Sequence, residues 1–229
     1  MIQSLHSLRC GRIALSSLAL AVVLPIALGV GLWAARRSQA QAPEGRPSTA
    51  REVSKKIWVS AREIQDRYPA AKHQEYMRRA IANSRKAGVE KRTGGAFGAV
   101  IVDRAGKIVA EGSNHVVSNF DPTWHGEMEA IRNACARRKA LKLDGCVLYT
   151  SSEPCPMCLA TAYWAGLDGI VFGAAVADSK KYGGFDDAFI YEQFASPASA
   201  RKIPQIQLLQ DEAVKVWKEY AALPDNVPY

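Results

Sequence analysis

Apolar residues follow two different periods along the chain, which predict helices and strands. Between Lys72 and Ala87 they recur at helical spacing, and Gly88 follows as a helix stop. Two apolar runs, within 94–104 and 107–112, flank the turn Arg104-Ala105-Gly106 and predict a β-hairpin. The first half of this region is therefore expected to be a helix followed by two strands.

Helices and strands alternate after the hairpin. The periodicity predicts further helices at 126–138, 156–165, 186–194 and 211–222, and further strands at 146–151, 169–174 and 203–209. Such alternation is typical of a layered α/β fold in which the later strands are largely parallel.

The N-terminus has a different pattern. From Ile13 to Ala35 there are 23 consecutive uncharged residues, with two arginines on either side. This length suffices to span a bilayer, which favours a membrane anchor, whereas Ser38 and Ala40 have the spacing of a cleavage site, which favours a signal peptide. Both interpretations predict an exported protein, either periplasmic or anchored to a membrane and facing the periplasm.

Three segments follow from these patterns. Residues 1–42 are expected to be the signal peptide or anchor, 43–70 a proline-containing linker, and 71–229 the globular domain. The membrane would then be contacted only through the N-terminal segment.

Composition places the domain among ordinary globular proteins. Of the 229 residues, 48% are hydrophobic and 23% charged, which excludes collagen, a coiled coil and bulk disorder. The net charge of +8 raises the question of a nucleic-acid partner. Residues 1–42 contain four arginines and no acidic residue, so the rest of the chain has 26 basic and 22 acidic residues. Such a surface does not indicate nucleic-acid binding.

The five cysteines are an odd number, and one lies in the N-terminal segment, so they are not a disulfide framework. Cys135 and Cys146 have apolar surroundings that favour small buried side chains. Cys155 and Cys158 instead lie three residues apart at the start of a predicted helix, where the positive helix end favours thiolates.

His125 and Glu127 open another predicted helix. One histidine and two cysteines are three ligands of the type that zinc prefers, and no fourth ligand lies near them in the sequence, as in a catalytic site that keeps one position for water. Glu127 is placed to carry protons without binding the metal. Each signal alone is weak, since a histidine is a common helix cap and a CxxC pair can be a redox centre. In combination, H-x-E followed by P-C-x-x-C is the pattern of zinc-dependent base deaminases.

The stretches TWHGEMEAI (123–131) and TSSEPCPMCLATAYWAG (150–166) resemble the cytidine deaminase superfamily, over about residues 74–229. GGAFGAVIVD (94–103), EGSNHVVSNFDPT (111–123) and GGFDDAFIY (183–191) are most similar to its bacterial guanine deaminase branch. This resemblance implies a three-layer α/β/α sandwich around a mixed five-stranded sheet, preceded here by the N-terminal hydrophobic segment, with one zinc ion per subunit.

The resemblance also implies roles for individual residues. The zinc ligands would be His125, Cys155 and Cys158, and the catalytic acids Glu127 and Asp187, with Asp186 as the alternative to Asp187. The substrate-binding residues would be Asn114, Phe97, Trp164 and Tyr229. Tyr229 would come from a second subunit of a homodimer, through an exchanged C-terminal segment. Gly126 stands where the family usually has alanine.

The implied reaction is hydrolytic deamination of a free purine base, guanine to xanthine and ammonia. One alternative is a tRNA adenosine deaminase, against which the nearly balanced charge of residues 211–229 argues. Another small molecule, such as cytosine or a nucleoside, stays open because the pocket size does not follow from sequence. A non-catalytic zinc-binding module would require a fourth protein ligand and no Glu127. On local pattern alone, Phe97 and Trp164 could equally be packing residues, and Asp186 or Asp187 a helix cap.

Overall fold

A computed structural model describes residue 56 and residues 58–227. The predicted export segment and linker start, at 1–55, and the predicted substrate residue Tyr229 lie outside the described residues. Within the described part of the chain, no helix has the length and apolar character needed to cross a membrane.

The centre of the fold is a mixed sheet with strand order β2-β1-β3-β4. Strand β1 pairs antiparallel with both β2 and β3, whereas β3 and β4 pair in parallel. The strands are β1 (Gly98–Val102), β2 (Ile108–Ser113), β3 (Val147–Ser152) and β4 (Gly169–Ala174). The predicted hairpin and the parallel later pair are both present.

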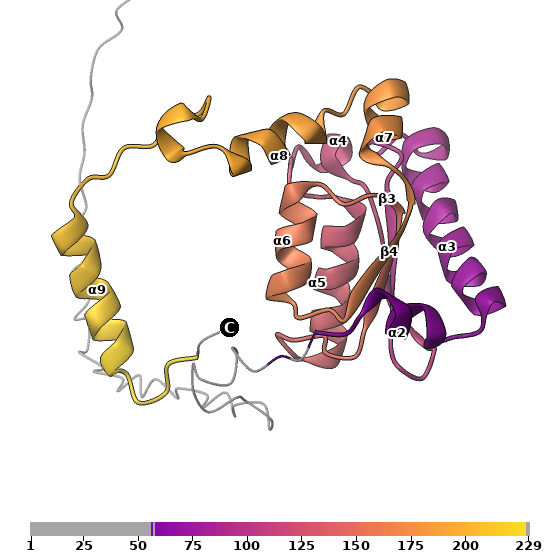
Figure 1. Ribbon diagram of the computed structural model, residues 1–229, viewed down its shortest axis with the longest axis horizontal. Helices are drawn as coiled ribbons and strands as arrows, with labels where there is room; N and C mark the ends of the chain where they lie inside the picture. Colours follow the sequence, from indigo (N-terminus) through magenta and orange to yellow (C-terminus); the bar gives the residue numbers. More distant parts are fainter. Residues whose placement is uncertain (1–55, 57, 228–229) are drawn as a thin grey trace, which may run out of the picture. The chain divides into compact units, whose positions relative to one another are not determined.

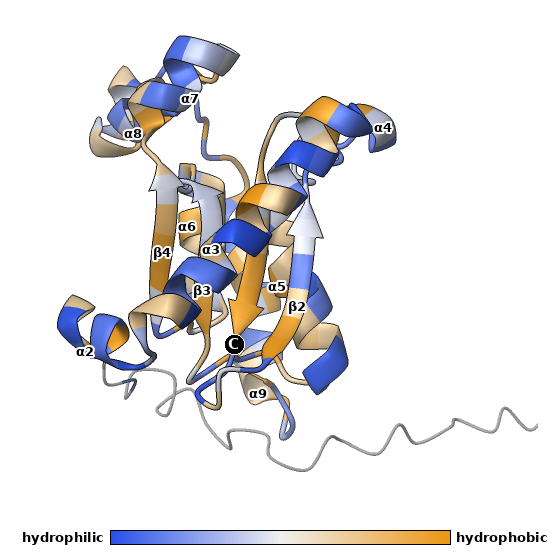
Figure 2. Cartoon of the chain, turned by 90° about the vertical axis from the view of Figure 1, so that its right-hand side faces the viewer, coloured by the Kyte–Doolittle hydropathy of each residue, from blue (hydrophilic) through white to orange (hydrophobic). Residues whose placement is uncertain are grey.

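Helices cover the two faces of the sheet (Figure 1). Helix α3 (Ala70–Arg85) packs on one face, and α5 (Gly126–Arg138) and α6 (Pro156–Trp164) pack on the other. Strands β1 and β3 are buried along their whole length. Apolar residues follow one another without alternation in β1 and in the first half of β3, as is typical of strands covered on both faces, whereas β3 ends with the polar residues Thr150, Ser151 and Ser152 (Figure 2). The predicted three-layer α/β/α sandwich is confirmed.

The sheet has four strands in the described residues, and the predicted fifth strand at 203–209 is absent. Its apolar side chains are exposed instead, with Ile203 at 80%, Ile206 at 89% and Leu208 at 80%. A strand needs a neighbour for its backbone hydrogen bonds, and within the described chain this segment has none. The prediction of a strand here was therefore wrong for the single chain.

Several helices were not predicted. The short helix α2 (Ala61–Asp66) lies in the segment predicted as a linker and starts with a capping box between Ser60 and Glu63. Ile64 and Tyr68 are buried in the core between α3 and the sheet, so the end of that segment is part of the domain. The other unpredicted elements are α4 (Val116–Asn119) and α7 (Val176–Gly183), with a π-helical turn at Lys86–Glu90 and a 3-10 turn at Ala198–Ala200. The helices predicted at 186–194 and 211–222 are present as α8 (Asp187–Ala195) and α9 (Gln210–Ala222).

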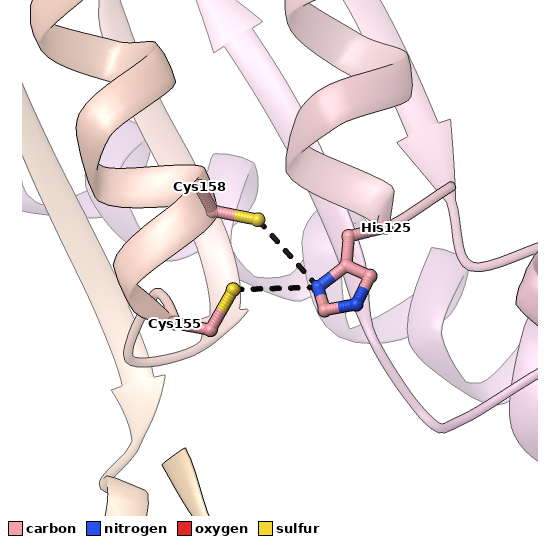
Figure 3. A group of neighbouring side chains, drawn as sticks. All are labelled: His125, Cys155 and Cys158. Atoms are coloured by element: carbon pink, nitrogen blue, oxygen red, sulfur yellow. Dashed lines mark hydrogen bonds between the residues drawn. The ribbon is translucent and has the colours of Figure 1, made fainter. Parts of the chain in front are cut away.

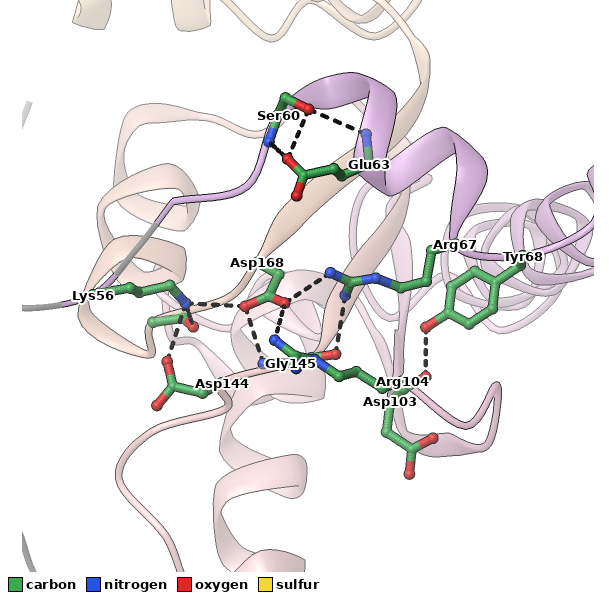
Figure 4. A network of polar contacts seen from close by, with 11 residues as sticks. Lys56, Ser60, Glu63, Arg67, Tyr68, Asp103, Arg104, Asp144, Gly145 and Asp168 are labelled. Atoms are coloured by element: carbon green, nitrogen blue, oxygen red, sulfur yellow. Dashed lines mark hydrogen bonds and ion pairs between the residues drawn. The ribbon is translucent and has the colours of Figure 1, made fainter.

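The residues before α3 are fastened to the sheet by a buried carboxylate, Asp168, at the start of β4 (Figure 4). Its side chain is 4% exposed and accepts hydrogen bonds from Arg67 (2.9 Å) and Lys56 (3.3 Å). The backbone N–H of Gly145 (3.0 Å) and the side chain of Arg104 (3.3 Å) donate to it as well. Burial alone would raise the pKa of Asp168, but the hydrogen bonds from Gly145, Arg67 and Lys56 outweigh it and hold that pKa below its usual range.

Replacing Asp168 by asparagine is expected to lower the free energy of unfolding at pH 7 by about 2–4 kcal/mol, because it leaves the largely buried guanidinium of Arg67 without its counterion. The pKa of Asp168 is depressed in the folded state, so its contribution is complete above a pH of about 4 and is lost as the pH falls through the folded-state value. The stability difference between wild type and variant should thus shrink with acidification in urea unfolding measured from pH 7 to pH 3.

The matched control is Asp144→Asn. Asp144 pairs with the same Lys56 at 3.1 Å but is 65% exposed, so its loss should change stability by less than about 1 kcal/mol. Equal effects of the two substitutions would contradict the role assigned to Asp168.

Candidate active site

Three potential metal ligands meet where two helices begin. His125 is the N-cap of α5, Cys155 is the N-cap of α6, and Cys158 lies in the first turn of α6. The Nδ1 atom of His125 lies 3.6 Å from the Sγ atoms of both cysteines (Figure 3). The three ligand atoms all fall within 4.8 Å of one another. The CxxC spacing places both sulfurs on the side of α6 that faces α5.

Glycines allow the start of α5 to lie directly on the sheet. A Cβ atom at Gly112 of β2 would come within 2.1 Å of the carbonyl oxygen of Gly126, and one at Gly126 would lie 3.0 Å from the Cα of Gly98. The glycine between His125 and Glu127, unusual for the family that the sequence resembles, therefore relieves a tight contact with β1.

Hydrogen bonds among the three candidate ligands shift their pKa values. The contacts from Cys158 and His125 lower the pKa of Cys155 to about 4 despite its burial. The hydrogen bond to Cys155, together with burial, raises the pKa of Cys158, and the contact with Cys155 raises the pKa of His125. These contacts favour the thiolate of Cys155, and a divalent cation would satisfy both sulfurs as thiolates.

This donor set fits zinc. One imidazole nitrogen and two thiolates are preferred zinc ligands, and three protein ligands leave a coordination position for water. Among the described residues, no further histidine, cysteine or carboxylate joins the group. The arrangement is that of a catalytic site rather than a closed structural one.

Glu127 lies next to this group as a buried carboxylate with one free oxygen. It is 2% exposed, and Thr150 Oγ1 donates a hydrogen bond to its Oε1 at 3.1 Å. Its Oε2 has no hydrogen-bond partner within the described part of the chain. Burial raises the pKa of Glu127, which suits a group that must accept and release protons near neutral pH.

A cavity of about 150 Å³ opens over these residues. The sequence-predicted residues that line it are Phe97, Asn114, His125, Glu127, Cys155 and Asp187. The ring of Phe97 lies parallel to that of His125, 6.3 Å between centroids. Asn114 is 2% exposed, and its Oδ1 accepts a hydrogen bond from the N–H of Val116 at 3.1 Å, so its amide group is held in place.

The structure separates the two neighbouring aspartates. Asp187 lines the cavity, and burial raises its pKa. Asp186 is exposed, caps α8 through the N–H of Phe189 (3.3 Å) and pairs with Lys180 (2.9 Å). Of the two, only Asp187 reaches the cavity, and its role as the second acidic residue stays a prediction.

One predicted substrate residue, Trp164, is not brought to the cavity in the described chain. Trp164 is 61% exposed and is the last residue of α6, about 9 Å along the helix axis from Cys158 and about 14 Å from Cys155. It does not line the cavity within the described chain. Tyr229 lies outside the described residues.

The cavity also contains residues that sequence reasoning missed. These are Glu153, which precedes the Pro154-Cys155 pair, Phe185, which contacts the ring of Phe97 edge-on at 4.9 Å, and Gly95, Val116 and Val117. The sequence contains two features that could have indicated these residues. Glu153 lies two positions before the candidate ligand Cys155, and Phe185 lies between a glycine pair and an aspartate pair.

Comparison with known proteins agrees with this site. Residues 70–174 match the family model of the cytidine and deoxycytidylate deaminase zinc-binding region. Guanine deaminase from Bacillus subtilis (strain 168) is 43% identical over 152 residues, which are 65% of this chain and 96% of that protein. A tRNA-specific adenosine deaminase from Aquifex aeolicus (strain VF5) is 39% identical over 92 residues, 40% of this chain and 58% of that protein.

A solved structure shows the same fold. The X-ray structure of guanine deaminase from Bacillus subtilis matches with a TM-score of 0.61 and 41% identity, over 68% of this chain and 99% of that one. The chain belongs to the cytidine deaminase superfamily of zinc-dependent hydrolytic deaminases, in its guanine deaminase branch. The predicted family, enzyme class and zinc cofactor are confirmed.

Proposed function

We propose that the protein hydrolyses guanine to xanthine and ammonia. The observation that carries this proposal is the similarity to the Bacillus subtilis guanine deaminase, which extends over 96% of that protein. The cavity of about 150 Å³ supports a substrate well below drug size, for which pockets start at about 300 Å³. A single heterocyclic base is a better match to it than a nucleoside or a folded RNA.

The cavity side chains have the chemistry to bind a planar, polar ring. Phe97 and Phe185 offer apolar surfaces for its faces and edges, and the buried amide of Asn114 offers hydrogen bonds to its polar edge. Asp187 is a second carboxylate in the same cavity, available to the exocyclic amino group.

Proton transfer falls to Glu127. His125, Cys155 and Cys158 would hold zinc, which would supply the Lewis acidity that makes water a nucleophile near neutral pH. Glu127 Oε2, which has no other partner in the described chain, accepts a proton of the attacking water and passes it to the ring nitrogen beside the carbon that carries the amino group. Glu127 then takes the remaining hydroxyl proton of the adduct to the amino group, the carbonyl of the product forms, and the C–N bond breaks to release ammonia with Asp187 beside it.

The test is ammonia release by the zinc-loaded full-length protein, offered guanine, adenine, cytosine, cytidine, guanosine and a tRNA anticodon hairpin in parallel. Turnover is expected with guanine and not with the others. In Glu127→Gln, zinc content should be unchanged while kcat for guanine falls about 10²- to 10⁴-fold, the usual contribution of a general acid–base group.

Glu129→Gln is the matched control for this substitution. Glu129 lies on the same helix but hydrogen-bonds the N–H of Ser113 (2.7 Å) and the indole of Trp124 (3.4 Å) outside the cavity, so its rate should stay within about tenfold of wild type. Full turnover of guanine by zinc-loaded Glu127→Gln would contradict the proposed role of Glu127 in proton transfer. Activity on another compound alone would keep the zinc chemistry and discard guanine.

We also propose a homodimer in which the C-terminal segments are exchanged and Tyr229 reaches the partner's cavity. Two observations support it. Strand β4 is a sheet edge beside an apolar cavity of about 770 Å³ that includes Ile64, Ile170 and Phe172. The segment from 203 onward, whose apolar residues include Trp217 at 70% exposure, has no buried residue in the described chain. A second copy of this segment would cover the edge and fill the cavity.

Subunit complementation tests the exchange. Glu127→Gln and Tyr229→Ala chains should each be nearly inactive as homodimers. Co-expressed and purified together, they should regain guanine deamination, because one of the two sites then combines Glu127 of one chain with Tyr229 of the other. The control is a mixed dimer of Glu127→Gln with Asp144→Asn, a surface variant whose active site is intact. Such a dimer has one competent site, and its activity is the full recovery expected for the test pair. Absence of recovery in a verified mixed dimer contradicts the exchange.

We further propose that the protein is exported, because 23 uncharged residues bounded by arginines precede the domain. Fractionation of cells that produce the full chain should place it in the periplasm or in the membrane. N-terminal sequencing then distinguishes a cleaved signal from an intact anchor, and recovery in the cytoplasm would refute export.

A further inference from the structure

Helices α7 and α8 and the turn between them contribute two residues to the active-site cavity, but neither helix has a buried residue. Phe185 lies between the two helices and Asp187 is the first residue of α8, and both line the cavity. No residue of either helix belongs to the buried core of the described chain. Hydrophobic burial therefore does not fix the position of these two side chains, and other contacts must do so.

Two hydrogen bonds join these helices to the loop that carries Cys155. The carboxylate of Glu153 accepts a hydrogen bond from the N–H of Val176, the first residue of α7, at 3.1 Å. The hydroxyl of Tyr191 on α8 donates to the carbonyl oxygen of Pro154 at 2.8 Å. The two attachment points, Glu153 and Pro154, are consecutive residues and directly precede the metal ligand.

Both contacts are well suited to hold a helix. A carboxylate at the N-terminus of α7 satisfies a free backbone N–H and lies at the positive end of the helix dipole. Burial raises the pKa of Tyr191 to about 12, so its hydroxyl stays protonated and donates at working pH. Between the two attached helices, α7 ends at Gly184 with a φ of 75°, a left-handed conformation that glycine adopts without strain.

Phe185 follows this turn directly. Its ring meets that of Phe97 at 4.9 Å, at the wall of the cavity. The segment 176–195 is thus attached on both sides of the residues that face the substrate, by one contact from α7 and one from α8. Figures 1 and 2 show both helices at the end of the sheet where β3 and β4 finish.

We propose that Glu153 and Tyr191 are positioning residues that hold α7 and α8 closed over the cavity and thereby set the affinity for the base. They act by holding Phe185 and Asp187 in place. Glu153 also lines the cavity itself, whereas Tyr191 does not line it in the described chain, so Tyr191 gives the cleaner test. If only a fraction of the molecules has the two helices in the closed position, the apparent affinity for the base is the intrinsic affinity multiplied by that fraction. This inference rests on the proposed function for its kinetic test, but its structural test does not.

Tyr191→Phe removes only the hydroxyl. KM for guanine should rise about fivefold, the factor that corresponds to one net hydrogen bond of ordinary strength, while kcat stays within about twofold. Glu153→Ala should act in the same way, whereas Glu153→Gln, which keeps an acceptor for the N–H of Val176, should restore KM to within about twofold of wild type. Zinc content should be the same in all variants.

Neighbouring residues supply the controls. Tyr182 on α7 is 79% exposed and Glu192 on α8 is exposed beside Tyr191. Neither side chain joins these helices to the metal loop, so Tyr182→Phe and Glu192→Gln should leave KM unchanged.

Hydrogen–deuterium exchange on the zinc-loaded full chain gives a readout that needs no activity. Peptides from 176–195 should exchange several times faster in Tyr191→Phe and Glu153→Ala than in wild type and the two controls, with peptides from α5 unchanged. Unchanged exchange and unchanged KM would overturn the inference, as would a loss of zinc and of kcat without a change in KM. If wild type does not deaminate guanine, the proposed function fails, and the exchange comparison still decides whether the two residues hold the helices.

Discussion

The contact between the start of α5 and the sheet determines where the catalytic groups lie. Gly112 and Gly126 let the helix backbone touch β2 and β1 with no side chain between them. On the opposite face, a Cβ at Gly98 would lie 2.4 Å from the N of Ser84 in α3, so β1 is packed tightly from both sides. His125 and Glu127 flank Gly126, and this packing leaves their side chains little freedom. The site is thus preorganised by backbone contacts in the core.

The second half of the site depends on α6 starting at the same edge of the sheet. β3 runs parallel to β4, and the helix between them must cross one face, where it lies beside α5. The positive ends of both helices then point to one place, which favours the thiolate of Cys155 and any anionic group that forms in the cavity. The fold therefore supplies part of the electrostatics of the reaction before any cofactor is bound.

Sequence reasoning succeeded where a local pattern carries the information. The helix 126–138 and the strand 169–174 have the bounds expected from periodicity, and the close spacing of chemically special residues indicated the zinc site. It failed where the outcome depends on a distant partner. The apolar run 203–209 has strand character but no neighbouring strand among the described residues. The places of Glu153 and Phe185 in the cavity arise only when α7 and α8 pack beside the metal loop. Trp164 lies on the predicted helix, but at its far end.

The position of Asp168 adds a constraint on the N-terminal segment. Asp168 and Gly145 precede β4 and β3, whereas Glu153 and the cavity follow the end of β3. Six residues of strand span about 20 Å, so Lys56, bound to Asp168, enters the domain at the opposite end of the strands from the active site. The ion pairs of Asp168 and the catalytic groups therefore lie at opposite ends of the same two strands, so the contacts that fasten Lys56 are separate from those that form the cavity.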